Sequence, residues 1–326
     1  MNSNQKYFKL FANCIAVKGA RRAIICDLQR GFYVEISNDS YNILNELKNK
    51  RIKDVSSNYD YNSFHEFISK LITNELGFYC DNPKRFPELD TSYLTPYVIE
   101  DCIIELSIFT LKNYKKIINS LNILGCQTIE LRCYNHINLN LVSKFISYLS
   151  NSRVKSVELY LKYSEAVSIE EYRLFLESYS IISYFVLHSY PFEINNIDND
   201  RLAFSKQNIS SASCCGKINK NLFRINLPFY LESQNKNNCL NRKISITENG
   251  DIKNCPSLEN SYGNIVNTKM EDVVKKKTFT DIWNVRKDEI NVCKDCEFRY
   301  ICSDCRAYVS GKFDKPLNCN YDPYSN

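Results

Sequence analysis

The distribution of cysteine constrains this chain more than any other feature of its sequence. The 326 residues include 15 cysteines, of which six occur singly through the first two thirds of the chain. The other nine fall roughly in the last third: Cys214, Cys215, Cys239, Cys255, Cys293, Cys296, Cys302, Cys305 and Cys319. We expect the scattered cysteines to be buried as small apolar residues. The nine clustered cysteines instead indicate a site to which several thiols contribute.

Disulfide bonds are a poor explanation for these thiols. The N-terminal stretch MNSNQKYFKLFANC lacks the apolar core and cleavage site of a secretory signal, so we expect a cytoplasmic protein, where disulfides are disfavoured. No apolar run is long enough to span a bilayer, so no membrane is expected. The net charge of +5 is small and the basic residues are mixed with acidic ones, so nucleic acid is not an expected partner.

Two CxxC units lie close together near the end of the chain. Cys293 and Cys296 form one unit, Cys302 and Cys305 form the other, and five residues separate them. Paired units of this kind are typical of zinc sites with four thiolate ligands. Zinc is therefore an alternative for these four residues.

Three further cysteines and a glycine favour iron–sulfur clusters over zinc. Cys239 and Cys255 flank Gly250, and Cys319 follows the CxxC units. A single zinc site leaves them unexplained, whereas thiolates are the usual ligands of iron within a sulfide cluster.

The spacing from Cys239 to Cys319 resembles the SPASM domain, the C-terminal extension of many radical S-adenosylmethionine enzymes that modify peptides. The resemblance implies two auxiliary 4Fe-4S clusters. It implies Cys293, Cys296, Cys302 and Cys319 as ligands of the second cluster. It implies Cys239, Cys255 and Cys305 as ligands of the first, completed by an upstream cysteine, either Cys214 or Cys215. The family more often has three residues where this chain has Ser303–Asp304.

The periodicity of the sequence predicts three α/β units. Residues 1–90 alternate as a small antiparallel sheet, followed by two amphipathic helices and a short strand, which predicts a winged-helix-like domain. Residues 91–204 repeat strand–helix units, which predicts a partial β/α barrel with parallel strands, related by the resemblance to the radical S-adenosylmethionine core. Residues 205–326 are rich in loops and form the expected SPASM iron–sulfur domain.

A catalytic radical enzyme of this superfamily carries CxxxCxxC after its first barrel strand. The middle segment holds only Cys102, Cys126 and Cys133, and the loop after IIELSIF reads TLKNYKK. We therefore expect no S-adenosylmethionine cofactor and no radical S-adenosylmethionine activity.

The whole chain resembles the SPASM-domain peptide maturases of grasp-with-spasm systems. The stretches LFANCIAVKGARRAIICDLQRGFYVEI and CEFRYICSDCRAY are similar to that family's opening and closing signatures. The resemblance implies maturation of a ribosomal peptide (RiPP), with a precursor peptide and an ATP-grasp ligase as partners.

Within that interpretation, residues 1–90 recognise the precursor peptide by pairing it with a sheet edge. Lys18, Arg21 and Arg22 are candidate contacts for acidic leader residues. The alternative is that these three side chains decorate a hairpin turn.

Other candidate chemistry is sparse. His188 ends a predicted strand without a recognisable partner acid. Glu105, Glu130 and Glu158 recur within predicted strands, where an ion network with Arg132 and Lys155 is the expected role and a polar lumen is the alternative. The favoured function is a cluster-bearing maturation factor, and the alternatives are a peptide-modifying oxidoreductase that uses its clusters and a zinc-stabilised binding protein.

Overall fold

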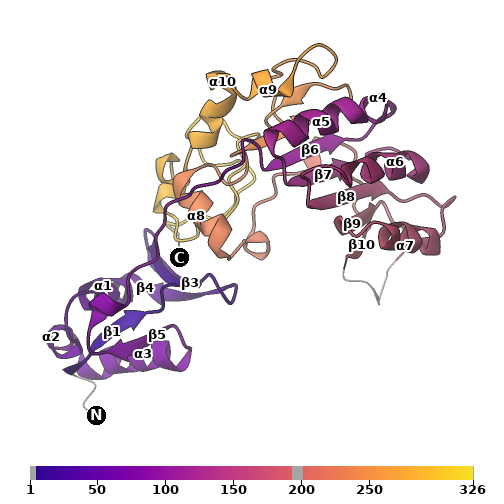
Figure 1. Ribbon diagram of the computed structural model, residues 1–326. Helices are drawn as coiled ribbons and strands as arrows, with labels where there is room; N and C mark the ends of the chain where they lie inside the picture. Colours follow the sequence, from indigo (N-terminus) through magenta and orange to yellow (C-terminus); the bar gives the residue numbers. More distant parts are fainter. Residues whose placement is uncertain (1–4, 193–200, 326) are drawn as a thin grey trace.

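The computed structural model describes residues 5–192 and 201–325, so a few residues of each of the three expected domains lie outside it. An N-terminal unit stands beside a larger body that holds a central sheet and the C-terminal region (Figure 1). Within the described ranges, no helix has the length and apolar character needed to cross a membrane.

The N-terminal unit has the expected order of strands, helices and final strand, with the short helix α2 added between the two expected helices. β2, β3 and β4 form an antiparallel sheet, whereas β1 pairs with β5 in a second one. Ser37 and Asp60 cap α1 and α3 by accepting hydrogen bonds from the backbone N–H groups of Ser40 and Ser63. The elements are β1 (Tyr7–Leu10), β2 (Cys14–Lys18), β3 (Arg22–Asp27), β4 (Phe32–Ser37), α1 (Asn38–Leu47), α2 (Ile52–Ser56), α3 (Tyr61–Thr73), β5 (Gly77–Cys80) and the short η2 (Pro83–Arg85).

The central unit confirms the predicted parallel sheet. β6, β7, β8, β9 and β10 pair in parallel, and α5, α6 and α7 lie along one side of them (Figure 1). Burial alternates along β7 and β8 because one face packs under these helices and the other carries polar side chains. The elements are β6 (Asp101–Glu105), α4 (Ile108–Lys112), α5 (Tyr114–Leu124), β7 (Thr128–Arg132), α6 (Leu139–Leu149), β8 (Ser156–Lys162), α7 (Ile169–Ser178), β9 (Ile182–His188) and β10 (Leu202–Ser205).

The central sheet does not stop at the boundary expected after residue 204. β10 crosses that boundary, and β11 returns from the C-terminal region to pair in parallel with β6, giving the order β10-β9-β8-β7-β6-β11-β12. Ile244, Ile246 and Phe279 consequently belong to the main hydrophobic core. Part of the supposedly loop-rich domain is thus stabilised by ordinary apolar packing.

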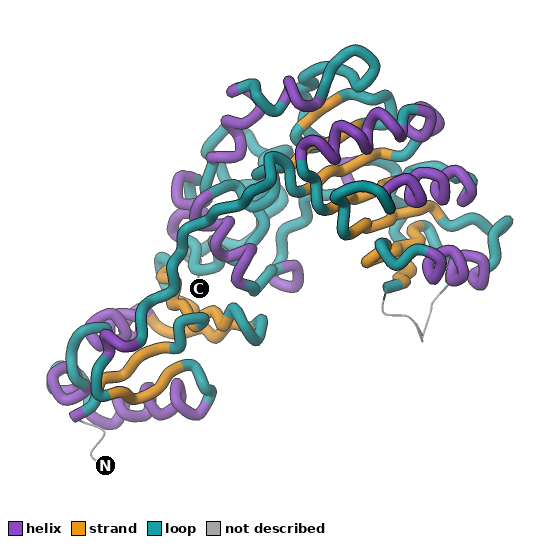
Figure 2. Tube along the Cα trace, viewed as in Figure 1, coloured by secondary structure: helices purple, strands orange, loops and turns teal. Residues whose placement is uncertain are grey.

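Loops dominate the remaining C-terminal region (Figure 2). Gly250 turns between β11 and β12 with a φ of +85°, and a Cβ there would lie 2.4 Å from the ring of Phe109. Only glycine fits that close approach. The elements are η3 (Ala212–Cys214), η4 (Lys220–Leu222), α8 (Leu227–Asn235), β11 (Lys243–Ile246), β12 (Ile252–Lys253), α9 (Met270–Val273), α10 (Lys277–Thr280), η5 (Asp281–Asn284), η6 (Lys287–Glu289) and η7 (Cys293–Asp295).

Candidate metal centre

A first group of four thiols draws on distant parts of the C-terminal region: Cys215, Cys239, Cys255 and Cys305. Burial, with contributions from Cys255 and Cys215, raises the pKa of Cys239 to about 11. Burial also raises the pKa of Cys305, to which Cys239 and Cys215 add, and that of Cys255, to which Cys215 adds. Ionisable groups shift one another's pKa in this way when they are close, so these thiols are neighbours.

The backbone beside Cys215 shows the same proximity. Gly216 has a φ of +82°, and a Cβ built on it would lie 3.1 Å from Sγ of Cys305. The chain therefore approaches the second CxxC unit closely enough to require glycine.

A second group consists of Cys293, Cys296, Cys302 and Cys319. Burial raises the pKa of Cys293 to about 11, and Cys319 and Cys302 contribute to that rise. Burial raises the pKa of Cys296 to about 12, with Glu297 and Cys302 contributing. A parallel bridge between Ile218 and Cys319 brings the final cysteine back beside the chain that follows Cys215.

Cys214 and Cys215 differ in their surroundings although they are adjacent. The Cys214 thiol donates to the carbonyl of Asn208 at 3.8 Å. The Cys215 sulfur instead accepts from Nη2 of Arg132, also at 3.8 Å, and contributes to the raised pKa values of the first group. Cys215, not Cys214, is the cysteine that the structure places with the first group.

Across the described residues, no three histidine, cysteine, aspartate or glutamate side chains are grouped so that they could hold a single metal ion. A four-iron cube is larger than one ion, so its thiolate ligands stand further apart than the four ligands of one zinc. The donor chemistry of each cysteine group, four thiols with nearby cations, fits a cluster.

Cations from outside the cysteine segments face the first group. Half-buried Lys243 on β11 lowers the pKa of Cys239 and of Cys255. Arg132, at the end of β7, pairs with Glu130 at 2.5 Å and donates to Cys215. Because thiolates are anions, these cations stabilise the ionised form that ligates metal.

The second group has a cation of its own. Lys287 is 4% exposed and donates from Nζ to the carbonyl oxygens of Cys302 and Ser303, at 2.7 and 3.0 Å. It also lowers the pKa of Cys293. Neither Lys287 nor Lys243 could be identified from the sequence, since both lie among many similar lysines.

Two asparagines connect the groups. Asn238 donates to the carbonyl of Cys302 at 2.9 Å and accepts from the N–H of Asp304 at 2.8 Å. Asn237 donates to the Asp304 carboxylate at 2.9 Å, and that buried carboxylate pairs with Arg306 at 2.8 Å. Asp304, between Cys302 and Cys305, is thereby fixed at the junction of the groups. The NN pair before Cys239 was the available sequence signal.

The N-terminal sheet covers the second group. Val17, Ile24 and Cys26 share a buried cluster with Phe298 and Cys302, to which other residues of both units contribute. The loop between β2 and β3 adds a backbone hydrogen bond from Ala20 N to Asp295 O at 2.7 Å. The expected recognition unit is therefore packed directly on the cysteine-rich region.

The three basic residues proposed for peptide contact lie at this junction. Arg22 pairs through Nε with Glu297 at 3.3 Å, and the Glu297 side chain is fully buried. Arg21 donates to the carbonyl of Tyr324 at 3.4 Å, and the carbonyl of Lys18 accepts from Arg299 at 2.7 Å. These contacts agree with the alternative that the residues belong to a turn, here a turn docked on the same chain.

The remaining sequence candidates have structural partners. Buried His188 contacts the carbonyl of Cys133 through Nε2 at 2.8 Å and the Ser189 hydroxyl through Nδ1 at 3.1 Å. Glu105 accepts from the Tyr134 hydroxyl at 2.6 Å and from the N–H of Glu248 at 3.2 Å. The pairing expected between the strand glutamates and Arg132 is confirmed for Glu130.

Comparisons with solved structures find a distant likeness to SuiB of Streptococcus suis. SuiB bound to its precursor peptide SuiA has 12% sequence identity and a TM-score of 0.37, covering 98% of this chain and 99% of that one. SuiB bound to S-adenosylmethionine has 13% identity and a TM-score of 0.34, covering 96% and 98%. No protein-family model and no curated protein matches this sequence. TM-scores this low carry no inference about function.

Proposed function

We propose that this chain is a maturation factor for a ribosomal peptide, which binds two 4Fe-4S clusters and the precursor peptide and acts with an ATP-grasp ligase. The observation that carries the cluster assignment is the separation of eight cysteines into two groups of four. Each group offers the four thiolates that one cube requires. Context and partners follow from the sequence resemblance.

The first cluster is assigned to Cys215, Cys239, Cys255 and Cys305. Cys215 supplies the upstream ligand that spacing alone left undecided, since it contributes to the raised pKa values of the other three thiols. Arg132 and Lys243 offset the negative charge of the bound thiolates.

The second cluster is assigned to Cys293, Cys296, Cys302 and Cys319. The mutual influence of Cys293, Cys302 and Cys319 supports this set. Bound clusters would supply one-electron transfer and would cross-link segments distant in sequence.

The grouping argues against the zinc alternative. A four-thiolate zinc site made of the two CxxC units requires Cys305 beside Cys293, Cys296 and Cys302. Cys305 instead neighbours Cys239 and Cys215.

Radical cleavage of S-adenosylmethionine is not part of the proposal. The segment after β6, where the family carries its three-cysteine loop, begins α4 at once. Ser107 caps this helix by accepting from the N–H of Thr110, and its hydroxyl donates to the carbonyl of Glu248 at 2.6 Å. The loop's place is thus taken by a helix cap tied to the C-terminal region.

The test is metal analysis of protein purified without oxygen. We expect about eight irons and about eight sulfides per chain, since each cube holds four of each. Stoichiometric zinc without sulfide would overturn the assignment. Reductant-dependent 5′-deoxyadenosine formation would overturn the proposed lack of radical activity.

Two adjacent cysteines provide a matched pair of variants. Cys215→Ala is expected to lower iron and sulfide by about half, because it removes one ligand of one cube. Cys214→Ala is expected to leave both unchanged. Equal losses from the two variants would refute the assignment of Cys215.

A further inference from the structure

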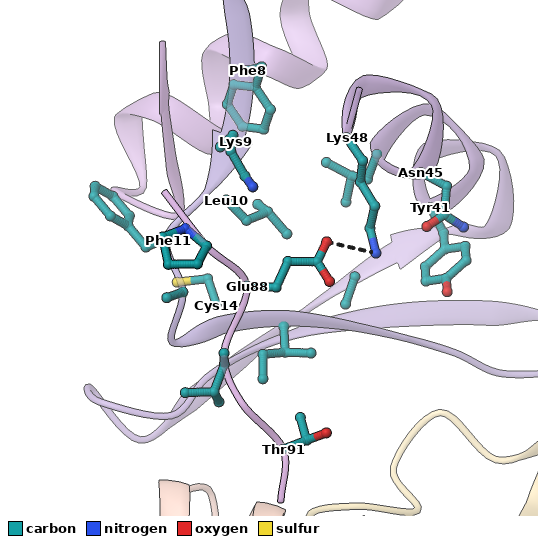
Figure 3. Close-up of a pocket in the computed structure, with 16 residues that line it drawn as sticks. Phe8, Lys9, Leu10, Phe11, Cys14, Tyr41, Asn45, Lys48, Glu88 and Thr91 are labelled. Carbon is teal, nitrogen blue, oxygen red and sulfur yellow. Dashed lines mark ion pairs between the residues drawn. The ribbon is translucent and has the colours of Figure 1, made fainter. Parts of the chain in front are cut away.

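An apolar pocket lies in the N-terminal unit. It has a volume of about 180 Å³ and lies between β1, β2 and α1 (Figure 3). Leu10, Cys14, Ala16 and Leu44 contribute apolar lining. An apolar cavity of about 150 Å³ accommodates a benzene ring, so this space suffices for one aromatic or branched aliphatic side chain.

Two strands that line the pocket are edge strands. β2 pairs only with β3, and β1 only with β5, within the part of the chain that the structure describes. Edge strands present unpaired backbone N–H and C=O groups that an extended peptide can use. The pocket therefore combines a side-chain cavity with nearby backbone partners.

The chain's own segment Phe86–Thr91, here called the strap, crosses this pocket and supplies Pro87, Glu88, Leu89 and Thr91 to its lining (Figure 3). Residues 87–95 form neither helix nor strand. The strap leads directly into the linker to the central sheet, where Asn235 donates to the carbonyl of Thr91 at 2.8 Å.

Two lysines at the pocket hold the strap. Lys9 donates from Nζ to the carbonyl of Phe86 at 2.8 Å, and Lys48 pairs with the Glu88 carboxylate at 3.3 Å. The side chains of Lys48 and Glu88 are 51% and 67% exposed. An ion pair this exposed contributes only about 0.2–1 kcal/mol, so the strap is exchangeable at this point.

We propose that this pocket is the anchor site for an extended peptide in which an aromatic or aliphatic residue adjoins an acidic one. The apolar side chain enters the cavity, and the acidic side chain replaces Glu88 beside Lys48. The strap carries the same chemistry, because apolar Leu89 and acidic Glu88 both line the pocket, and it competes with the peptide. The inference rests on the proposed precursor-binding function and specifies where the peptide binds.

The test measures binding of a synthetic probe to the full-length protein. The probe is a fluorescein-labelled peptide RFPELDT, which copies residues 85–91, and fluorescence anisotropy reports its affinity. Glu88→Lys places two ammonium groups together and weakens the strap. We expect this variant to bind the probe about fivefold more tightly than the wild type, since attraction is replaced by repulsion of similar size.

Two further variants make the result specific. Glu66→Lys changes the charge equally at another exposed ion pair, with Lys70 on α3, and is expected to bind the probe as the wild type does. Adding Lys48→Glu to Glu88→Lys restores an ion pair with reversed charges and repels the acidic probe, so binding should return to the wild-type level or below.

Equal probe affinity for Glu88→Lys and Glu66→Lys would overturn the inference. Dimerisation of Glu88→Lys that the probe does not reverse would also overturn it, because a second copy's strap would then be the occupant. Iron content is an independent readout. A failed probe with full iron content refutes only the pocket, whereas iron-free protein that binds the probe refutes the cluster assignment and leaves the pocket supported.

Discussion

The two cysteine groups differ in which parts of the chain supply their thiols, cations and apolar contacts. The first group collects thiols from residues 215 to 305, and its cations Arg132 and Lys243 come from strands of the central sheet. The second group lies within residues 293–319, its cation Lys287 is local, and its apolar cover comes from the N-terminal sheet.

Each cysteine group therefore contacts a different part of the protein. The central sheet provides charge to the first group, and the N-terminal unit shields the second from water. A change in the N-terminal contact should therefore reach the second group and leave the first unaffected. Leu89 of the strap packs against the cluster that contains Cys302, so the proposed peptide site adjoins the second group.

The largest expected effect comes from removing the aromatic ring that joins the N-terminal sheet to the second group. Phe298 is 1% exposed and lies 5.3 Å from the ring of Tyr33 and 5.1 Å from that of Phe223, between centroids. Phe298→Ala should lower the free energy of unfolding by about 3–5 kcal/mol, measured by denaturant unfolding.

Cysteine alkylation read by mass spectrometry tests whether that effect is local. In Phe298→Ala protein we expect faster labelling of Cys296 and Cys302 but not of Cys239 and Cys255. Phe313→Ala is the matched control, because Phe313 is 42% exposed and should change neither stability nor labelling appreciably. Equally faster labelling of both groups would contradict the separation.

An effect of intermediate size concerns how the free energy of unfolding depends on pH. Burial raises the pKa of Glu232 on α8 from 4.5 to about 7. The folded state therefore favours the protonated form, and this stabilisation is complete below pH about 4.5 and is lost as the pH rises to about 7. Its size is at most about 3 kcal/mol, from 1.36 kcal/mol per pKa unit.

Urea unfolding at a series of pH values measures this slope. Glu232→Gln should flatten the profile between pH about 4.5 and about 7, because the amide does not titrate. Glu259→Gln, at an exposed position, is the control and should keep the wild-type slope. A slope that survives Glu232→Gln would show that another group is responsible.

The smallest expected effect separates two adjacent arginines at the N-terminal contact. Arg22→Met removes an ion partner of the fully buried Glu297 carboxylate, which keeps only the Tyr321 hydroxyl among its described partners, and should cost about 1–3 kcal/mol. Arg21→Met loses one exposed hydrogen bond and should change stability by less than about 0.5 kcal/mol. Comparable losses in thermal unfolding would show that the turn is not docked through Arg22.

Much of the fold could be predicted because local patterns dictate it. Apolar alternation and helix caps predicted most N-terminal elements and the parallel strands β6, β7, β8 and β9, but not α2 or β10. β11 was missed because its four residues, KISI, lie among cysteines and asparagines and show too short a pattern. Its pairing with β6 joins residues more than a hundred positions apart, which no local pattern reports.

By itself, the sequence determined that thiols gather in the C-terminal region and that a parallel sheet precedes them. Only the tertiary structure distinguishes Cys214 from Cys215, which are adjacent in the sequence and which spacing does not separate. Cys214 ends a short 3₁₀ turn, whereas Cys215 has extended backbone with φ −84° and ψ 176°. This change of backbone points the two side chains to different surroundings, so that only the Cys215 sulfur meets Arg132 and the first group.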